Sequence, residues 1–386
     1  MARNRVIYQS EALYVSENIL SATSGKHKQL DRVQSANYNF AISRQDINQY
    51  GQLARIDSVV LDTPTVNLDF SYYLTDGTSE RALGFNVLTG SGTAVSFLSN
   101  MMTEVSGDNM YIVTSSEGLD ANLVNNSTGG DIKSVIGFGN VFLTDYTLEV
   151  AVGALPTVSI TAEASNINAT LGGIVRSSGA SGTIVNSGIG TFSPAVNPSG
   201  GLPFTGTFVT LPSGTNNTGG NSISALRYGD VSLSLGTINS GILSDISSSV
   251  DGIHIQSASL SVPLSRTPLQ RLGSKFPFAR LVDFPLNVTL NVSAILNEIT
   301  AENLATTIDT NPTVDIVLAI KKPGVTNTEN AMTYTLKGAK LDSESISSSI
   351  GSNKTVDLVF STQIGGTNDT VNGLFVSGFG TGAIFS

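Results

Sequence analysis

The stretch VQSANYNFAISRQDINQYG (residues 33–51) has a second version later in the chain, IQSASLSVPLSRTPLQRLG (residues 255–273). Both versions contain Gln-Ser-Ala, then alternating residues, then Ser-Arg, and both end on a glycine. The comparison extends over residues 33–74 and 255–296 without a gap, at a constant offset of 222. Eleven of the 42 aligned positions are identical, whereas random pairing would give about three. The sequence therefore predicts a tandem duplication.

Weaker matches extend the repeat over both halves. YQSEALYV from Tyr8 aligns with YGDVSLSL from Tyr228, and the segment that begins at Leu143 aligns with the one that begins at Leu341. Each half also contains a stretch with helical character after the repeated strands. These are TAVSFLSNMMTEV from Thr93 and ILNEITAENLATTI from Ile295, and we expect one short helix in each half.

Between the two copies lies a segment dominated by Gly, Ser, Thr, Asn and Pro. Such a composition is typical of a flexible linker. However, TGTFVTL within it alternates like a strand, so an extended arm or a hairpin is the alternative. The predicted organisation is a first β domain at residues 1–167, a spacer at residues 168–221, and a second β domain at residues 222–386.

Alternation of apolar and polar residues predicts strands with one buried face and one wet face. In each copy two segments alternate in this way, and the apolar positions of the second copy follow those of the first at the same offset. The expected buried positions are Ala36, Tyr38, Phe40, Ile42, Val66, Leu68 and Phe70, with Ala258, Leu260, Val262, Leu264, Val288, Leu290 and Val292 as their counterparts. The fold class is therefore dominated by β-structure.

Composition and charge exclude several classes of function. The chain has 386 residues, no cysteine and a net charge of −10 at pH 7, so it has no disulfide and no thiolate metal site. An acidic chain is poorly suited to gripping DNA or anionic lipid, because Lys and Arg supply that affinity. The start of the chain lacks the apolar run of a secretory signal, and no apolar run of about 18 residues predicts a membrane-spanning helix.

Motifs of catalysis and of cofactor or metal binding are missing from the sequence. The two histidines, His27 and His254, lie in polar or strand-flanking contexts, and no G-x-S-x-G elbow presents a serine. There is no H-E-x-x-H and no EF-hand loop, and the glycine-rich pieces lack the spacing and the lysine of a phosphate loop. We therefore expect neither an enzyme nor a cofactor.

The paired strands at residues 33–43 and 65–74, the helix expected from Thr93, and their second-copy counterparts resemble the tail tube proteins of bacteriophages with long flexible tails. The resemblance implies a β-sandwich or half-barrel with a flanking helix, in rings that stack into a hollow tube. It also implies two fused tube domains per chain, so that a homotrimer mimics a ring of six domains. The implied partners are further copies of the chain, other tail proteins and passing double-stranded DNA, without a membrane. The implied location is the virion, assembled in the bacterial cytoplasm and used in DNA ejection.

On this resemblance, the wet faces of the repeated strands line the channel. The expected lining residues are Asn67, Asp69, Ser71, Thr289, Asn291 and Ser293. A weakly negative wall would repel DNA phosphates within about 8 Å at physiological salt, and the genome would pass without adhering. The alternative is that this face is an ordinary solvent-exposed surface.

Two arginine-containing loops follow the first repeated strand of each copy and are the expected contacts between subunits. Their candidate residues are Arg44, Gly51, Arg55, Arg266, Arg271 and Gly273, with Arg44 and Arg266 expected to pair with carboxylates of a neighbour. The alternative is a local turn in which the glycine adopts positive φ. Other functional classes also stay open: a baseplate ring, a capsid decoration or fibre, and a surface adhesin or carbohydrate-binding sandwich.

Overall fold

The computed structural model describes residues 11–16, 27–61, 64–89, 95–103, 107–115, 121, 132–176, 184–186, 226–235, 253–274, 276–296, 312–322, 330–350 and 353–378. Strands dominate these residues, and one short α-helix, α1 (Thr78–Ala82), accompanies them. The main element is a sheet of sixteen strands, in which all neighbours are antiparallel except β7 and β20. The prediction of a fold dominated by β-structure is confirmed.

The first half of the chain supplies one end of this sheet. Its strands are β1 (Glu11–Ser16), β2 (His27–Gln29), β3 (Val33–Ala41), β6 (Thr65–Tyr73), β7 (Val87–Thr89), β8 (Asp108–Ser115), β9 (Ile132–Ala151), β10 (Thr157–Arg176) and β11 (Ile184–Asn186). The order of the main strands is β1-β8-β9-β10-β6-β3, so β3 forms the edge. A separate hairpin, β4 (Arg44–Ile47) with β5 (Asp57–Val60), connects β3 to β6.

The second half supplies the other end. Its strands are β12 (Val231–Ser234), β13 (Ile253–Pro263), β16 (Leu286–Leu296), β17 (Val314–Lys321), β18 (Asn330–Ser347), β19 (Thr355–Ile364) and β20 (Gly373–Gly378). Their order is β12-β17-β18-β19-β16-β13. A hairpin of β14 (Arg266–Leu269) and β15 (Ala279–Val282) connects β13 to β16. Two 3₁₀ turns, η2 (Met101–Thr103) and η3 (Tyr228–Asp230), complete the described elements.

The two halves of the sheet have the same strand registers. Ser35 lies opposite Ser71 in β3–β6, and the residues 222 positions later, Ser257 and Ser293, lie opposite each other in β13–β16. The two hairpins are also related by 222, since β4–β5 and β14–β15 have the same pairing. The pairs β9–β10 and β18–β19 are related by 198 positions, including a register shift at the same place in each. Strand order, register and irregularities therefore correspond between the halves.

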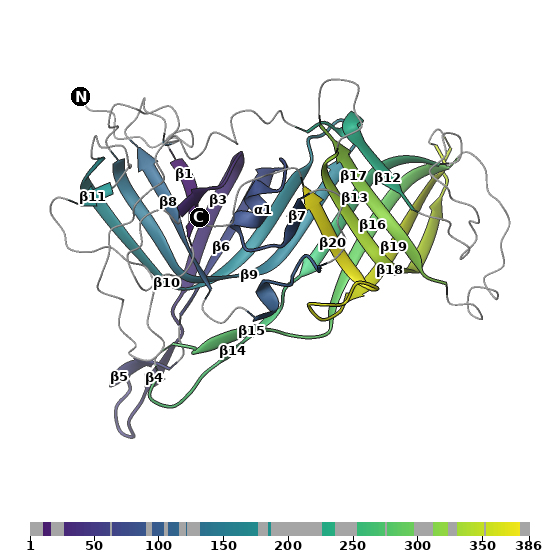
Figure 1. The fold of residues 1–386 in the computed structure, drawn as a ribbon. Coiled ribbons are helices and arrows are strands. Elements are labelled where there is room, and N and C mark those ends of the chain that lie inside the picture. The colour runs from purple at the N-terminus through teal and green to yellow at the C-terminus, as the bar shows by residue number, and fades with distance from the viewer. Residues whose placement is uncertain are drawn as a thin grey trace.

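Strand pairing joins the halves into one curved sheet (Figure 1). β13, the strand of the second half that corresponds to β3, pairs with the C-terminal part of β9 in the first half. β20 of the second half pairs in parallel with β7 of the first. Figure 1 shows α1 beside β7, with both hairpins extending below the sheet in this view. The halves are thus connected through the sheet and through the elements that cover it.

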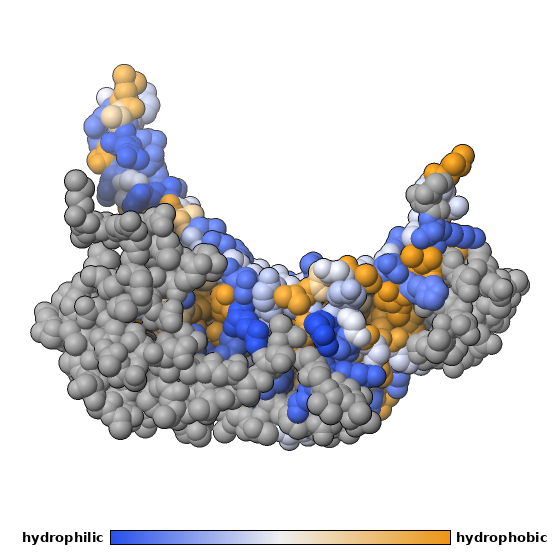
Figure 2. Space-filling model, turned by 90° about the horizontal axis from the view of Figure 1, so that it is seen from above, coloured by the Kyte–Doolittle hydropathy of each residue, from blue (hydrophilic) through white to orange (hydrophobic). Residues whose placement is uncertain are grey.

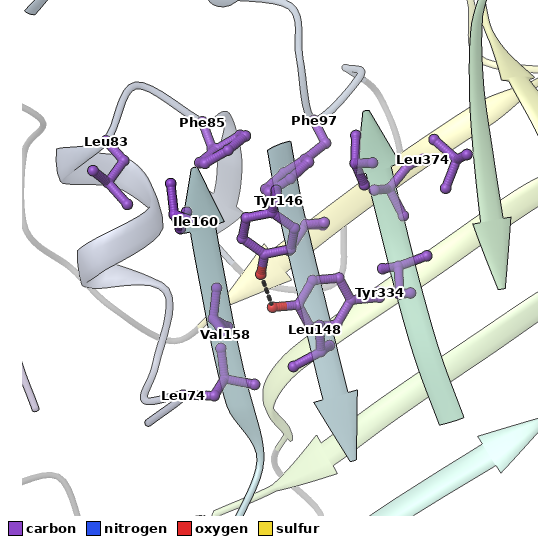
Figure 3. Close-up of a cluster of buried hydrophobic side chains, with 14 of the residues drawn as sticks. Leu74, Leu83, Phe85, Phe97, Tyr146, Leu148, Val158, Ile160, Tyr334 and Leu374 are labelled. Carbon is purple, nitrogen blue, oxygen red and sulfur yellow. Dashed lines mark hydrogen bonds between the residues drawn. The ribbon is translucent and has the colours of Figure 1, made fainter. Parts of the chain in front are cut away.

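The core is one continuous hydrophobic cluster that includes residues of both halves. Phe85 stacks on Phe97 with ring centroids 4.4 Å apart, and both rings meet Tyr146 edge-on (Figure 3). The predicted buried positions are confirmed on β6, β13 and β16, where they are at most 5% exposed. In and just after β3 the prediction is wrong for Tyr38, Phe40 and Ile42, which are 42, 54 and 41% exposed, whereas Ala36 is half-buried against the core. The three exposed residues lie on or just after an edge strand, and no strand of the described residues continues the sheet beyond it.

The helix expected from Thr93 is wrong over the residues that the structure describes. Residues 95–100 form turns that end in η2. The backbone of Phe97 bonds to distant segments, because its N–H donates to Leu374 O at 2.9 Å and its carbonyl accepts from Asn86 N at 2.8 Å. At Phe97 these tertiary hydrogen bonds take the place of the i to i+4 bonds of a helix, and a single i to i+4 bond, from Met102 N to Leu98 O at 3.1 Å, is found in the following turn. The helix expected from Ile295 lies mostly outside the described residues, and Ile295 itself belongs to β16.

The predicted spacer begins within a strand. β10 continues as far as Arg176, and β11 pairs with its end, with Ile174 opposite Asn186. This described part of the spacer therefore forms a hairpin-like extension of the sheet. The rest of residues 168–221 lies outside the described residues.

Candidate functional site

One face of the sheet carries a row of hydroxyl side chains that crosses seven neighbouring strands. Each member lies directly opposite the next, so strand register alone aligns them: Ser35 (β3), Ser71 (β6), Ser159 (β10), Thr147 (β9), Ser261 (β13), Thr289 (β16) and Ser361 (β19). The hydroxyl oxygens of Ser35 and Ser71 are 2.7 Å apart, within hydrogen-bond distance. None of the seven residues is buried. The row passes from one half to the other because β9 and β13 are paired.

Carboxylates lie on both sides of this row. By register, Asp69, Asp145, Glu149 and Asp357 belong to the same face as the hydroxyl groups, and Lys340 is a cation on that face. We call this surface, with the hydroxyl row, the polar face. The arrangement gives it hydroxyl groups flanked by an excess of negative charge, without the stacked aromatic and cationic side chains of a surface that binds nucleic acid. Seen from above, the outline of the molecule is hollowed between two raised ends (Figure 2).

All six residues that the sequence predicted to line a channel lie on the polar face. The exposed ones are Asp69 and Asn291, and the others are half-buried: Asn67, Ser71, Thr289 and Ser293. Asn67 donates through its side-chain amide to the Asn39 side-chain oxygen at 3.1 Å, which links β6 to the edge strand. The structure therefore brings the six together on one surface, and channel lining stays a prediction.

The joint between the halves is made of paired strands with a fully buried interior. Leu260 of β13 lies opposite Leu148 of β9, and Val262 lies opposite Tyr146. All four side chains are at most 1% exposed, and burial of such side chains contributes about 1.5–3 kcal/mol each. The Tyr146 hydroxyl also lies 2.8 Å from that of Tyr334, a hydrogen bond inside the core (Figure 3). Sequence reasoning missed this pair, because nothing local marks two tyrosines 188 positions apart.

The β14–β15 hairpin of the second half binds the first half next to this joint. Arg266 donates to Leu143 O at 3.2 Å, and its guanidinium lies 5.1 Å from the centre of the Phe142 ring. Arg280 forms an ion pair with Glu163 at 2.5 Å, and its side chain is 4% exposed. Arg266 was predicted as a contact, and it contacts the other half of its own chain. Arg280 and Glu163 were missed, although an arginine in the apolar stretch FPFARLV was a usable signal.

The remaining predicted contact residues lie on the two hairpins. Arg44 is exposed at the start of β4, and Arg55 pairs with Asp46 of the same hairpin at 2.9 Å. Arg271 lies over the ring of Phe278, 5.7 Å from its centre. The contacts of Arg55 and Arg271 lie within their own hairpins, and contacts between subunits stay a prediction.

Gly51 and Gly273 occupy the same place in their hairpins, with φ of +88° and +83°. Because a Cβ at either position would meet no atom within 4 Å, the positive φ itself explains the glycine.

Two of the open edges of the sheet are β3 and the C-terminal part of β18; among the described strands, β12, β2, β7 and β11 are also paired on one side only. β3 pairs with β6 on one side, and no strand of the described chain lies along its other side. The C-terminal part of β18 pairs with β19, and no described strand lies along its outer side either. Apolar residues are strongly exposed near both edges, namely Tyr50 and Leu53 in the β4–β5 hairpin and Ile350 after β18. Figure 2 shows hydrophobic residues at the tips of both raised ends.

A group of acidic residues lies around α1, under the sheet. Glu80 is fully buried and accepts a hydrogen bond from the Tyr72 hydroxyl at 2.9 Å. Burial raises the pKa of Glu80 to about 7, and the neighbouring carboxylates of Asp76 and Asp31 add to the shift. Burial and Asp76 likewise raise the pKa of Asp31 to about 6. Sequence reasoning did not single out these residues, because their proximity depends on the fold.

Within the described part of the chain, no group of three or more His, Asp or Glu side chains is placed to hold a metal ion. No helix among the described residues is long and apolar enough to cross a membrane. Neither a protein-family model nor a curated protein matches the chain. The features of the described structure that bear on function are the joint between the halves, the open edges and the polar face.

Proposed function

We propose that the protein is a structural subunit that joins head to tail with copies of itself into rings, and that these rings stack into a hollow tube of the bacteriophage-tail type. The joint between β13 and β9 carries this proposal. In this joint, β13 of the second half pairs along the outer side of the C-terminal part of β9, the long strand of the first half. The corresponding strands, β3 and the C-terminal part of β18, are open edges among the described residues, and open edges tend to pair with further strands.

The corresponding registers support a chain built from two copies of one β unit. Each copy would be a β-sandwich or half-barrel of the tail-tube type, and three chains would then supply six units to a ring. A joint between two different surfaces generates a closed ring when the rotation between subunits closes. We therefore infer a homotrimeric ring with pseudo-six-fold symmetry.

The polar face would line the channel of this tube. Hydroxyl groups stay hydrated and offer no cation to a phosphate, and the carboxylates on both sides of the hydroxyl row repel one. Double-stranded DNA would then pass during ejection without being held. Asp69 and Asn291 occupy corresponding positions in the two copies, so charge would alternate around the ring.

Native mass spectrometry and negative-stain electron microscopy of the concentrated protein test this function. We expect trimers and stacked hollow rings. Closed rings that never stack would contradict a tube and favour a baseplate or decoration role, and a monomer at every concentration would contradict assembly through the open edges. Asp69→Asn is the matched variant, because it places in the first copy the residue that the second copy already has. We expect it to assemble normally.

A further inference from the structure

We propose that β3 of one chain pairs antiparallel with the C-terminal part of β18 in a second copy, with Tyr38 opposite Ile346, and that the β4–β5 hairpin fits the groove beside that strand. This inference rests on the proposed head-to-tail assembly and specifies its joint. It names the two edges, their register and the residues that meet, none of which follows from assembly alone.

The joint inside the chain supplies the register. Leu260 of β13 lies opposite Leu148 of β9. β3 corresponds to β13 at an offset of 222, so Leu260 corresponds to Tyr38. β18 corresponds to β9 at an offset of 198, so Leu148 corresponds to Ile346. Two chains that repeat the internal joint therefore place Tyr38 opposite Ile346.

Burial differs between the corresponding strands as this joint requires. In and just after β13, Leu260, Val262 and Leu264 are at most 1% exposed. In and just after β3, the corresponding Tyr38, Phe40 and Ile42 are 41–54% exposed. The strands have the same register with their inner neighbours, so the inner side does not account for the difference. The outer side accounts for the difference in exposure, since β9 lies along the outer side of β13 and no described strand lies along the outer side of β3. β3 thus leaves exposed an apolar surface that β13 buries against a neighbour.

Hydrogen bonds at both ends of the internal joint have counterparts in the proposed one. Leu264 N donates to Thr144 O at 2.9 Å, and Val152 N donates to Gln256 O at 2.9 Å. By the same offsets, Ile42 N would donate to Asp342 O of the second copy, and Ile350 N of the second copy would donate to Gln34 O. Ile350 is fully exposed in the single chain. The corresponding Val152 is 58% exposed at the internal joint, so the proposed joint would cover Ile350 only in part.

A groove of about 680 Å³ lies beside β18, and its lining includes Gly338, Lys340, Asp342 and Ser361. These residues correspond, at an offset of 198, to positions 140, 142, 144 and 163 of the first half. In the first half the β14–β15 hairpin covers that surface through Arg266 and Arg280. The β4–β5 hairpin has the register of β14–β15, and among the described residues it extends away from the sheet, with its Arg55–Asp46 ion pair inside the hairpin (Figure 1). We therefore assign it to the groove of the second copy, where Arg44 takes the place of Arg266.

Cysteine cross-linking tests the register, because the chain has no cysteine of its own. Asn39 and Ser345 would face each other across the joint, as Ser261 and Thr147 do inside the chain. We expect Asn39→Cys mixed with Ser345→Cys to form a disulfide-linked dimer on oxidation. Either variant alone should not, because identical edges do not meet. Opposed residues have Cβ atoms within disulfide reach and diagonal ones do not, so Asn39→Cys with Ser343→Cys should give about tenfold less dimer.

Two controls keep the result interpretable. Ser261→Cys with Thr147→Cys in one chain should form an internal disulfide, which shows that this geometry permits the bond. Asn37→Cys with Ser347→Cys provides a second intermolecular pair in the same register, in case one substitution disturbs folding. All variants should match the unmodified protein in far-UV circular dichroism.

The outcomes separate this joint from the proposed function. Rings in native mass spectrometry without a disulfide from either pair would overturn the β3–β18 joint and leave the ring subunit standing. Disulfide-linked open chains that never close would support the joint and contradict the ring. A protein that neither cross-links nor associates would contradict both.

Discussion

Glu80 of α1 makes the stability of the fold depend on pH, because its carboxyl group is fully buried. One oxygen accepts the Tyr72 hydroxyl at 2.9 Å, and among the described residues the other oxygen has no hydrogen-bond partner. Burial, together with the nearby Asp76 and Asp31, raises its pKa from 4.5 to about 7. The folded protein therefore binds this proton more tightly than the unfolded chain does.

The sign of the pH dependence follows from this difference. The stability that Glu80 contributes is fully present below pH 4.5 and is lost as pH rises through about 7. Since one pKa unit corresponds to about 1.4 kcal/mol, the loss between pH 5 and pH 8 is about 2–3 kcal/mol. Glu80→Gln removes the titratable carboxyl group but keeps a side-chain oxygen that can accept the hydrogen bond of the Tyr72 hydroxyl. The variant should therefore become more stable relative to the unmodified protein, by this amount, between pH 5 and pH 8.

Urea unfolding of both proteins at pH 5 and pH 8, followed by circular dichroism, measures this change. Any cost of packing the amide that does not depend on pH cancels in the comparison. Glu149→Gln removes one carboxylate from the exposed polar face and controls for the loss of a charge. Free-energy differences between Glu80→Gln and the unmodified protein that are equal at the two pH values would refute a buried group that takes up a proton on folding.

Four further substitutions probe the joint between the halves and the open β3 edge, each measured by urea unfolding of the unassembled protein. Tyr334→Phe leaves the buried Tyr146 hydroxyl without its partner and should cost about 1–3 kcal/mol, with part of the loss recovered when both tyrosines are Phe; an unchanged midpoint would contradict the hydrogen bond. Leu264→Ala, at 0% exposure, should cost about 2–5 kcal/mol. The corresponding Ile42→Ala, at 41% exposure, should cost less than about 1 kcal/mol, and equal losses would contradict an open β3 edge. Glu163→Gln should cost about 1–3 kcal/mol, because its arginine partner is 4% exposed while the carboxylate is itself partly screened by water; no loss in low salt would contradict the ion pair.

The repeated strands β3, β6, β13 and β16, and the buried faces of the last three, could be predicted from the sequence. Val66, Leu68 and Phe70 alternate with Asn67 and Asp69, and the structure places the first three in the core and leaves the other two outside it. This works because successive side chains of a strand point to opposite faces, so the pattern of burial is written locally. The offset of 222 could also be found in the sequence, and the structure places β13 and β16 at that offset from β3 and β6.

The helix expected from Thr93 shows where local reasoning fails. Phe97, Leu98 and Met101 are apolar at helical spacing, and all three are buried. These side chains are buried although they lie in turns and not in an α-helix. The backbone of Phe97 forms hydrogen bonds with the backbones of Leu374 and Asn86. The apolar pattern correctly indicated that these side chains are buried. It did not indicate which backbone groups would form hydrogen bonds with the backbone of Phe97.

The sequence by itself indicated the four repeated strands, the alternation of apolar and polar residues in them, and the offset of 222 between them, because alternation and spacing can be followed along the chain. Only the tertiary structure decided that Leu260 is buried while Tyr38 at the corresponding position is not, since that depends on whether another strand lies alongside. The hydroxyl row, the Tyr146–Tyr334 hydrogen bond and the raised pKa of Glu80 have the same origin. Each arises from groups far apart in the chain, and burial and electrostatic interaction depend on distance in space.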